Sequence, residues 1–140
     1  MDGLMSGLRE IAEFVARSTF GVDQQRREVV EQAWVEEGRF EFHLNGEVVR
    51  EAEGRDTILS RLEAAWQTRP VGASRHVITN LWVEHCDEET ATVFYYLTLV
   101  SGRDQPPRII ATGVYRDYLV RRDGAWRWRE RLLELDGPIG

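Results

Sequence analysis

The sequence predicts an α+β fold, in which a strongly curved, mainly antiparallel sheet forms a cone-shaped barrel with three helices of the N-terminal half packed on it. Two observations predict this class: helix-period patterns dominate the first half of the chain, and long strand-period runs follow one another in the second half. Because long strands twist, such a sheet curves, and helices laid across its concave side leave room for a pocket. The 140 residues fit one domain, 1–140.

Three amphipathic helices are expected. The first should end near Gly21, which can take a left-handed conformation at a helix C-terminus. Asp23 follows it and is placed to cap a second helix, which continues through Trp34 and stops at 37–38. The third helix covers residues 56–69 and ends before a proline.

Strand-like runs with two hairpin signals fill the rest of the chain. The expected strands are 39–44, 75–85, 90–101, 108–122 and 126–135. Asn45-Gly46 and Asp123-Gly124 are dipeptides that favour tight hairpin turns. Strict alternation along the strand 75–85 places four side chains on one face: His76, Ile78, Asn80 and Trp82.

The composition excludes several function classes. The net charge is −6 and no basic run occurs, so no nucleic-acid partner is expected. All 18 cationic residues are Arg, which excludes a lysine Schiff base. The single Cys86 excludes an intramolecular disulfide. Without a long apolar run or a basic, signal-like start, the expectation is a cytoplasmic protein with no membrane partner.

Three polar residues are the candidates for chemistry, since no nucleophilic-serine, phosphate-loop, zinc-protease or dinucleotide motif occurs. Asp23 could orient the ring of His76, whose free nitrogen would then abstract a proton. Arg131 could stabilise the negative charge that develops. The alternatives are structural: a helix cap for Asp23, a backbone-bonded strand end for His76 and a surface ion pair for Arg131.

The predicted pocket would be mostly apolar, as small-molecule sites usually are. Alternation selects six lining candidates: Phe40, Phe42, Ile78, Tyr95, Leu97 and Tyr115. The alternative for each is ordinary core packing. No metal site is expected, because the adjacent His85, Cys86 and Asp87 point different ways on a strand end.

Several segments together resemble a known family: Gly21-Val22-Asp23, 33–38, Arg75-His76 with Asn80, 113–117, 121–126 and Arg131. They look like the SnoaL-like branch of the nuclear-transport-factor-2-like superfamily, and within it the scytalone dehydratase, bile acid 7α-dehydratase and lindane dehydrochlorinase group. The resemblance implies that Asp23 and His76 form that group's catalytic dyad. It also implies that Arg131 takes the place of the arginine near the dehydrochlorinase's leaving chloride, in a lyase without a cofactor.

The function expected is therefore a cofactor-independent acid/base lyase or isomerase, dehydratase- or cyclase-like, on a small, largely apolar substrate, cyclic molecules included. A first alternative is a non-catalytic binding module or assembly subunit, like the small subunit of ring-hydroxylating dioxygenases. A second is an epoxide hydrolase, which needs two aspartates and an arginine around a water. Asp117 has no obvious partner for that role.

Two further expectations follow from strand alternation. Arg131 lies on the face opposite Trp126 and Trp128, so it reaches the pocket only if a β-bulge occurs near 129–130. Four apolar residues, taken as exposed on the convex face, predict a homodimer or homotrimer: Trp82, Leu119, Trp126 and Trp128.

Overall fold

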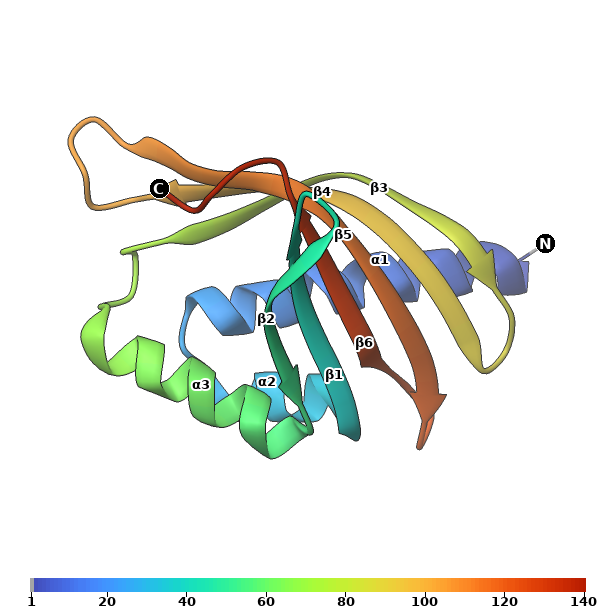
Figure 1. The fold of residues 1–140 in the computed structure, drawn as a ribbon. Helices are drawn as coiled ribbons and strands as arrows, with labels where there is room; N and C mark the ends of the chain where they lie inside the picture. The colour runs from blue at the N-terminus through green and yellow to red at the C-terminus, as the bar shows by residue number, and fades with distance from the viewer. Residues whose placement is uncertain (1) are drawn as a thin grey trace.

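The computed structural model describes residues 2–140, with the side chains of residues 6–140. Three helices and six strands follow one another in the order α1 (Asp2–Asp23), α2 (Arg27–Ala33), β1 (Trp34–Leu44), β2 (Glu47–Glu53), α3 (Arg55–Thr68), β3 (Arg75–Cys86), β4 (Thr90–Ser101), β5 (Arg108–Arg122) and β6 (Ala125–Leu135). The helices lie on the concave side of one curved sheet (Figure 1). The predicted α+β class is confirmed.

The six strands form one open sheet in the order β2-β1-β6-β5-β4-β3. All neighbouring pairs are antiparallel except β1 and β6, which run parallel. The sheet is curved as predicted but does not close, and β2 and β3 are its two edges. Helix α1 packs on β3 and β6, and α3 covers β1 and β2.

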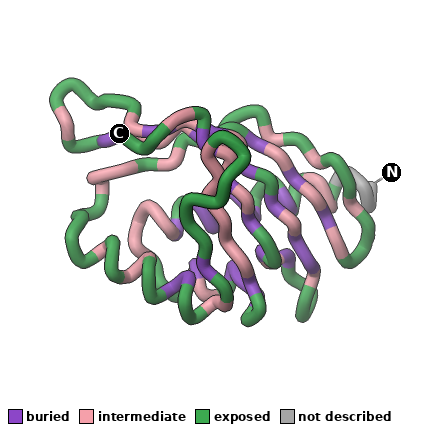
Figure 2. Tube along the Cα trace, in the orientation of Figure 1, coloured by how far each residue is buried: buried purple, intermediate pink, exposed green. Residues whose placement is uncertain are grey.

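The core lies between the helices and the concave face of the sheet. Buried and less buried residues alternate along the central strands (Figure 2). Three aromatic rings meet at its centre: Trp128 is 5.2 Å from Phe14 of α1 and 5.4 Å from Trp34, measured between ring centroids. Burying such large rings supplies much of the apolar driving force for packing helices on this sheet.

The boundaries of the first two helices differ from the prediction. Helix α1 continues to Asp23, and Gly21 is not left-handed; a Cβ there would lie 2.6 Å from a methyl carbon of Val29, so the glycine permits close packing of α1 on α2. The left-handed residue is Gln25, with φ 58°. Arg26, not Asp23, precedes α2, and it makes no side-chain cap.

Helix α2 also ends earlier than predicted, at Ala33. Trp34 is extended, with φ −107° and ψ 143°, and it pairs with Trp128 across the parallel strands. The helical spacing of apolar residues continued to Trp34 in the sequence, but burial of this ring against β6 favours the strand.

A bulge in β3 overturns the predicted alternation. Asn80 has φ 58°, and the pairing with β4 shifts between Thr79 and Trp82. One extra residue reverses the faces that follow it. Trp82 is therefore 54% exposed on the outer face, while Leu81 packs against the core. The prediction that Asn80 and Trp82 share the face of His76 is wrong.

A second bulge lies in β6, where the expectation placed it. Tyr118 of β5 pairs with Glu130 and Leu119 pairs with Trp128, which leaves Arg129 as the extra residue. Trp128 and Arg131 are therefore both buried on the concave side.

The apolar surface assumed for self-association is mostly interior. Trp126, Trp128 and Leu119 are at most 5% exposed within the single chain, and only Trp82 of the four lies outside. The homodimer or homotrimer stays a prediction.

Both hairpin turns are where the sequence predicted them. Asn45 and Gly46 have φ of 53° and 78°, and Asp123 and Gly124 have 54° and 76°. Two successive positive φ values define the turn type that matches the twist of antiparallel strands. Within residues 2–140, no helix is long and apolar enough to cross a membrane.

Gly113 provides a test of packing within the sheet. A Cβ there would lie 2.5 Å from the carbonyl oxygen of Glu134 on β6, so Gly113→Ala should lower the free energy of unfolding by about 1–3 kcal/mol. Gly7 of α1 faces open space, and Gly7→Ala should instead add about 0.5–1 kcal/mol. Urea unfolding measures both; equal stability of the Gly113 variant and the wild type would contradict the close approach.

Candidate active site

Asp23 and His76 are joined by two hydrogen bonds. The ring Nδ1 of His76 lies 2.6 Å from Oδ1 of Asp23, and the backbone N–H of His76 donates to Oδ2 at 3.0 Å. With Asp23 ionised, Nδ1 carries the proton of a neutral ring, and the lone pair of Nε2 is free to accept one. Nε2 makes no hydrogen bond to any side chain of residues 6–140.

The two residues meet because of where their elements end. Asp23 is the last residue of α1, and His76 is the second residue of β3, on which α1 packs. A carboxylate that bonds both the backbone and the ring of one residue fixes the ring's position as well as its tautomer. The side chains of Asp23 and His76 are 11% and 23% exposed.

All three histidines of the chain lie beside a carboxylate, but their surroundings differ. His43 Nε2 is 2.7 Å from Glu41, and His85 Nε2 is 3.1 Å from Asp87. The His85 side chain is 55% exposed. Neither His43 nor His85 lines the apolar cavity that His76 faces. A carboxylate partner alone therefore does not distinguish His76; its position on the cavity does.

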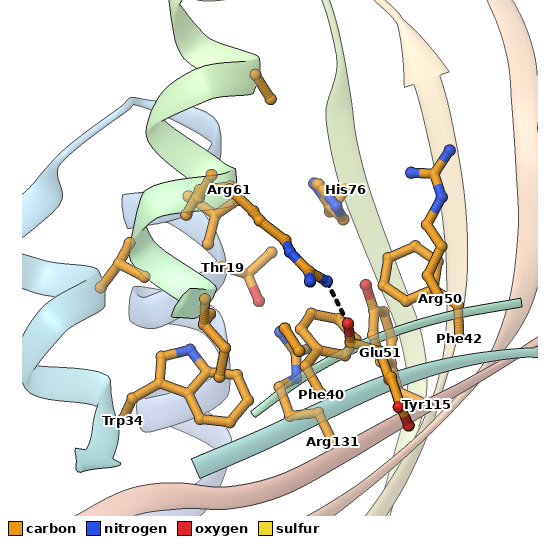
Figure 3. Close-up of a pocket in the computed structure, with 16 residues that line it drawn as sticks. Thr19, Trp34, Phe40, Phe42, Arg50, Glu51, Arg61, His76, Tyr115 and Arg131 are labelled. Carbon is orange, nitrogen blue, oxygen red and sulfur yellow. Dashed lines mark hydrogen bonds between the residues drawn. The ribbon is translucent and has the colours of Figure 1, made fainter. Parts of the chain in front are cut away.

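The cavity has a volume of about 270 Å³ and lies between the three helices and the concave face of the sheet, with residues of every strand except β4 in its lining (Figure 3). Its walls are mostly apolar. The lining residues include Val22, Val30, Trp34, Phe40, Phe42, Ile58, Leu62 and Tyr115. Its polar groups come from His76, Thr19, Glu51 and three arginines. A second hollow, about 460 Å³, adjoins it, because the two share seven lining residues, among them His76 and Tyr115.

Three of the six predicted lining residues border the cavity: Phe40, Phe42 and Tyr115. Tyr95 and Leu97 are 1% and 2% exposed, packed in the core. Leu97 borders only the second hollow, and Ile78 packs against the core and borders neither. Strand alternation predicted correctly that these residues face the helices. It did not predict whether a helix or the cavity lies over each of them.

Arg131 lies at the cavity wall and is held from behind by a buried polar network. Its Nε donates to Oδ1 of Asp117 at 3.2 Å, and its Nη2 donates to the hydroxyl of Tyr95 at 2.7 Å. That hydroxyl donates to Oδ2 of Asp117 at 2.5 Å, and the indole N–H of Trp128 donates to the same oxygen at 2.8 Å. The guanidinium also lies 4.0 Å from the Trp128 ring centroid and 4.3 Å from that of Tyr115.

Charge and burial fix the protonation of these groups. Burial disfavours the charged form of Arg131, but the attraction of Asp117, together with that of Tyr95 and Tyr115, raises the pKa of this arginine above its usual value. Burial also raises the pKa of Tyr115, although Arg131 opposes the rise. The cavity therefore has a permanent cation beside a neutral hydroxyl, and both can donate hydrogen bonds.

Asp117 is the main residue to which the sequence reasoning gave no role. It is 0% exposed and pairs with Arg131. Both its oxygens accept bonds from protein groups, and Asp117 does not line the cavity. The signal was present: Asp117 shares the inward register of Tyr115 and Leu119, where a carboxylate needs a buried cation. Two other functional candidates, Arg50 and Arg61, were also missed.

Comparison with known protein families identifies the family of this chain. The model of the SnoaL-like domain matches residues 6–132, and the chain belongs to this family. No curated protein matches the sequence.

Solved structures share the fold over almost the whole chain. Three come from Novosphingobium aromaticivorans. A nuclear-transport-factor-2-like protein with a cystatin-like fold is 23% identical, with a TM-score of 0.79 and coverage of 96% of this chain and 86% of that one. A protein provisionally described as a scytalone dehydratase is 22% identical. Its TM-score is 0.81, and the match covers 97% of this chain and 88% of that one.

The third is the beta subunit of a protein provisionally described as an aromatic-ring-hydroxylating dioxygenase, at 17% identity. Its TM-score is 0.81, and the match covers 99% of this chain and 94% of that one. Identities this low show a common fold and say nothing about a common activity. The same fold thus occurs both in a protein described as an enzyme and in one described as a subunit.

Removing the charge of Asp117 tests the buried pair. Asp117→Asn leaves the Arg131 guanidinium buried without its counter-charge, and losing one partner of such a pair costs about 3–5 kcal/mol of unfolding free energy. Asp104→Asn is the matched control, because Asp104 pairs with Arg108 on the surface and its loss should leave stability nearly unchanged. Similar urea midpoints for both variants would show that the buried pair is not fixing the fold.

The two buried tyrosines predict a pH effect. Burial raises the pKa of Tyr95 well above the usual 10.0, and raises that of Tyr115 as well. Their contribution to stability is complete below the unfolded pKa of 10.0 and is lost as the pH rises above it. In an absorbance titration at 295 nm, part of the tyrosinate signal should appear only with unfolding. Tyr95→Phe and Tyr115→Phe should each reduce that part. If the whole tyrosinate signal appeared before the protein unfolded, the burial of these two hydroxyls would be contradicted.

Proposed function

We propose that the protein is a cofactor-independent acid/base lyase or isomerase acting on a small, largely apolar molecule. One observation carries the proposal: His76 is held by Asp23 through two hydrogen bonds, its Nε2 bonds no described side chain, and its ring lines an apolar cavity. Catalytic bases need this combination of a fixed tautomer, a free nitrogen and a dry site.

In this mechanism Nε2 of His76 takes a proton from a carbon next to an activating group such as a carbonyl. The ring becomes an imidazolium, which Asp23 stabilises without taking the proton. The electron pair left on the substrate is delocalised onto the carbonyl oxygen as an enolate. His76 then returns the proton to a departing hydroxyl, which gives water and an alkene, or to another carbon, which gives an isomer.

Arg131 and Tyr115 are the groups suited to stabilise the enolate oxygen. Both line the cavity, and the Arg131 guanidinium lies 4.3 Å from the Tyr115 ring centroid, so the two donors are adjacent. The nearby hydroxyl of Tyr95 is not available for this role, because it donates to Asp117 and Tyr95 does not line the cavity. Preorganised donors of this kind are typically the largest single contribution to such catalysis.

The non-catalytic alternative expects a cavity packed solid with His76 paired elsewhere. The cavity of about 270 Å³ and the Asp23–His76 bonds favour the enzyme. An epoxide hydrolase needs a second carboxylate opposite Arg131. Asp117 is fully engaged behind the arginine, and the cavity wall offers no second aspartate, so that reaction is not proposed.

Deuterium exchange tests the proposed base without a known substrate. A panel of cyclic β-hydroxy ketones and enones is incubated with the protein in D₂O, and mass spectrometry detects both exchange at carbon and loss of water. General-base catalysis is worth about two to four orders of magnitude, so His76→Ala and Asp23→Asn should each lose at least about a hundredfold in rate while keeping the wild-type circular dichroism spectrum.

His85→Ala is the matched control, because His85 also bonds a carboxylate but lies outside the cavity. Its rate should equal that of the wild type. Normal turnover by the His76 variant, or an equal loss in the His85 variant, would refute the assignment.

A further inference from the structure

Two arginines at the cavity extend the proposed function to a substrate class. Arg50 of β2 and Arg61 of α3 both line the cavity that His76 and Arg131 border (Figure 3). Both are exposed on one side, at its mouth. The charge of Arg131 is balanced by Asp117, which leaves the charges of Arg50 and Arg61 to be accounted for.

No carboxylate side chain among residues 6–140 forms an ion pair with Arg50 or Arg61. Arg50 lies 5.8 Å from the Phe42 ring centroid and makes no hydrogen bond to a described side chain. Arg61 donates only to the backbone oxygen of Glu51, the contact drawn in Figure 3. Six of the 18 arginines form ion pairs among the described residues, for example Arg122 with Glu37 at 2.7 Å and Arg108 with Asp104 at 2.8 Å. What sets Arg50 and Arg61 apart from the other unpaired arginines is their place on the cavity that His76 lines.

The carboxylates near the cavity are turned away or already engaged. The carboxylate of Glu51 pairs with Arg39 at 3.2 Å, away from the cavity, since Arg39 does not line it. Asp23 is occupied by His76. The mouth therefore carries an unbalanced positive charge in a protein whose net charge is −6. Low-dielectric walls such as Phe42 and Leu62 concentrate that field at the opening.

We infer that the substrate is an amphiphilic organic anion. Its apolar body enters the cavity, and its carboxylate stays at the mouth, bound by Arg50 with Arg61 as the second donor. The planar fork of an arginine matches a carboxylate in two parallel hydrogen bonds. A cavity of about 150 Å³ can hold benzene, so one of about 270 Å³ suits a body of roughly two fused rings. This inference rests on the proposed use of the cavity as the substrate site.

A pair of fluorescent probes tests the charge preference at equilibrium. The anionic 8-anilinonaphthalene-1-sulfonate and the neutral N-phenyl-1-naphthylamine share an apolar body and differ by one sulfonate. At low ionic strength the wild type should bind the anionic probe about tenfold more tightly. Arg50→Gln should remove most of that preference, the double variant with Arg61→Gln should remove it fully, and neither should change the affinity for the neutral probe. Arg50→Lys should keep part of it, because the charge remains.

Arg17→Gln is the matched control: it removes an exposed arginine of α1 that does not line the cavity and forms no ion pair with the side chains of residues 6–140. It should leave both affinities unchanged. The inference is overturned if the neutral probe binds as tightly as the anion, if Arg17→Gln weakens the anion as much as Arg50→Gln does, or if the anion does not bind saturably. The readout needs no turnover, so an inactive His76 would count against the proposed function alone.

Discussion

The ion pair between Arg131 and Asp117 is the constraint around which this molecule is built. Placing two opposite charges in a protein interior costs several kcal/mol per ion, and their attraction repays that cost only if every remaining polar position is satisfied. Here Tyr95 and Trp128 complete the shell of Asp117, and aromatic faces surround the guanidinium. The network joins β4, β5 and β6 directly behind the cavity, so it fixes both the central sheet and the position of the cation.

A local irregularity in the backbone makes this pair possible. Without the extra residue at Arg129, Arg131 would lie on the face opposite Trp128 and could not reach Asp117. The sequence indicated this bulge, because strict alternation along β6 puts Arg131 on the face opposite Trp126 and Trp128. Only an extra residue lets the arginine and the tryptophans face the same side. The bulge at Asn80 gave no such signal, since apolar residues lie on both faces of β3. Alternation fails where neither face is clearly polar.

The elements and hairpins could be predicted because they depend on local patterns and turn residues. The helix ends depend on tertiary contacts: Trp34 prefers the sheet because Trp128 lies opposite it, and Gly21 serves the contact with Val29 rather than a turn. The two residues proposed as the dyad came from resemblance to a family. No spacing along the chain shows that positions 23 and 76 meet.

Cavity residues were harder to predict than core residues. Tyr95 and Tyr115 lie on neighbouring strands and face the same way, with ring centroids 5.0 Å apart, yet only Tyr115 borders the cavity. What separates them is how the helices cover the sheet, and that is not encoded in strand alternation. The unpaired arginines escaped notice because the sequence shows charges but not which carboxylates lie nearby.

The parallel pairing of β1 with β6 also has a consequence for how the chain folds. It joins residues about ninety positions apart, such as Phe40 and Arg131, and closing so long a loop must precede any gain from the contact. Both residues border the cavity. During synthesis, the emerging polypeptide can form its helices and first hairpin early, but it completes the pocket only when its last strand is released and docks.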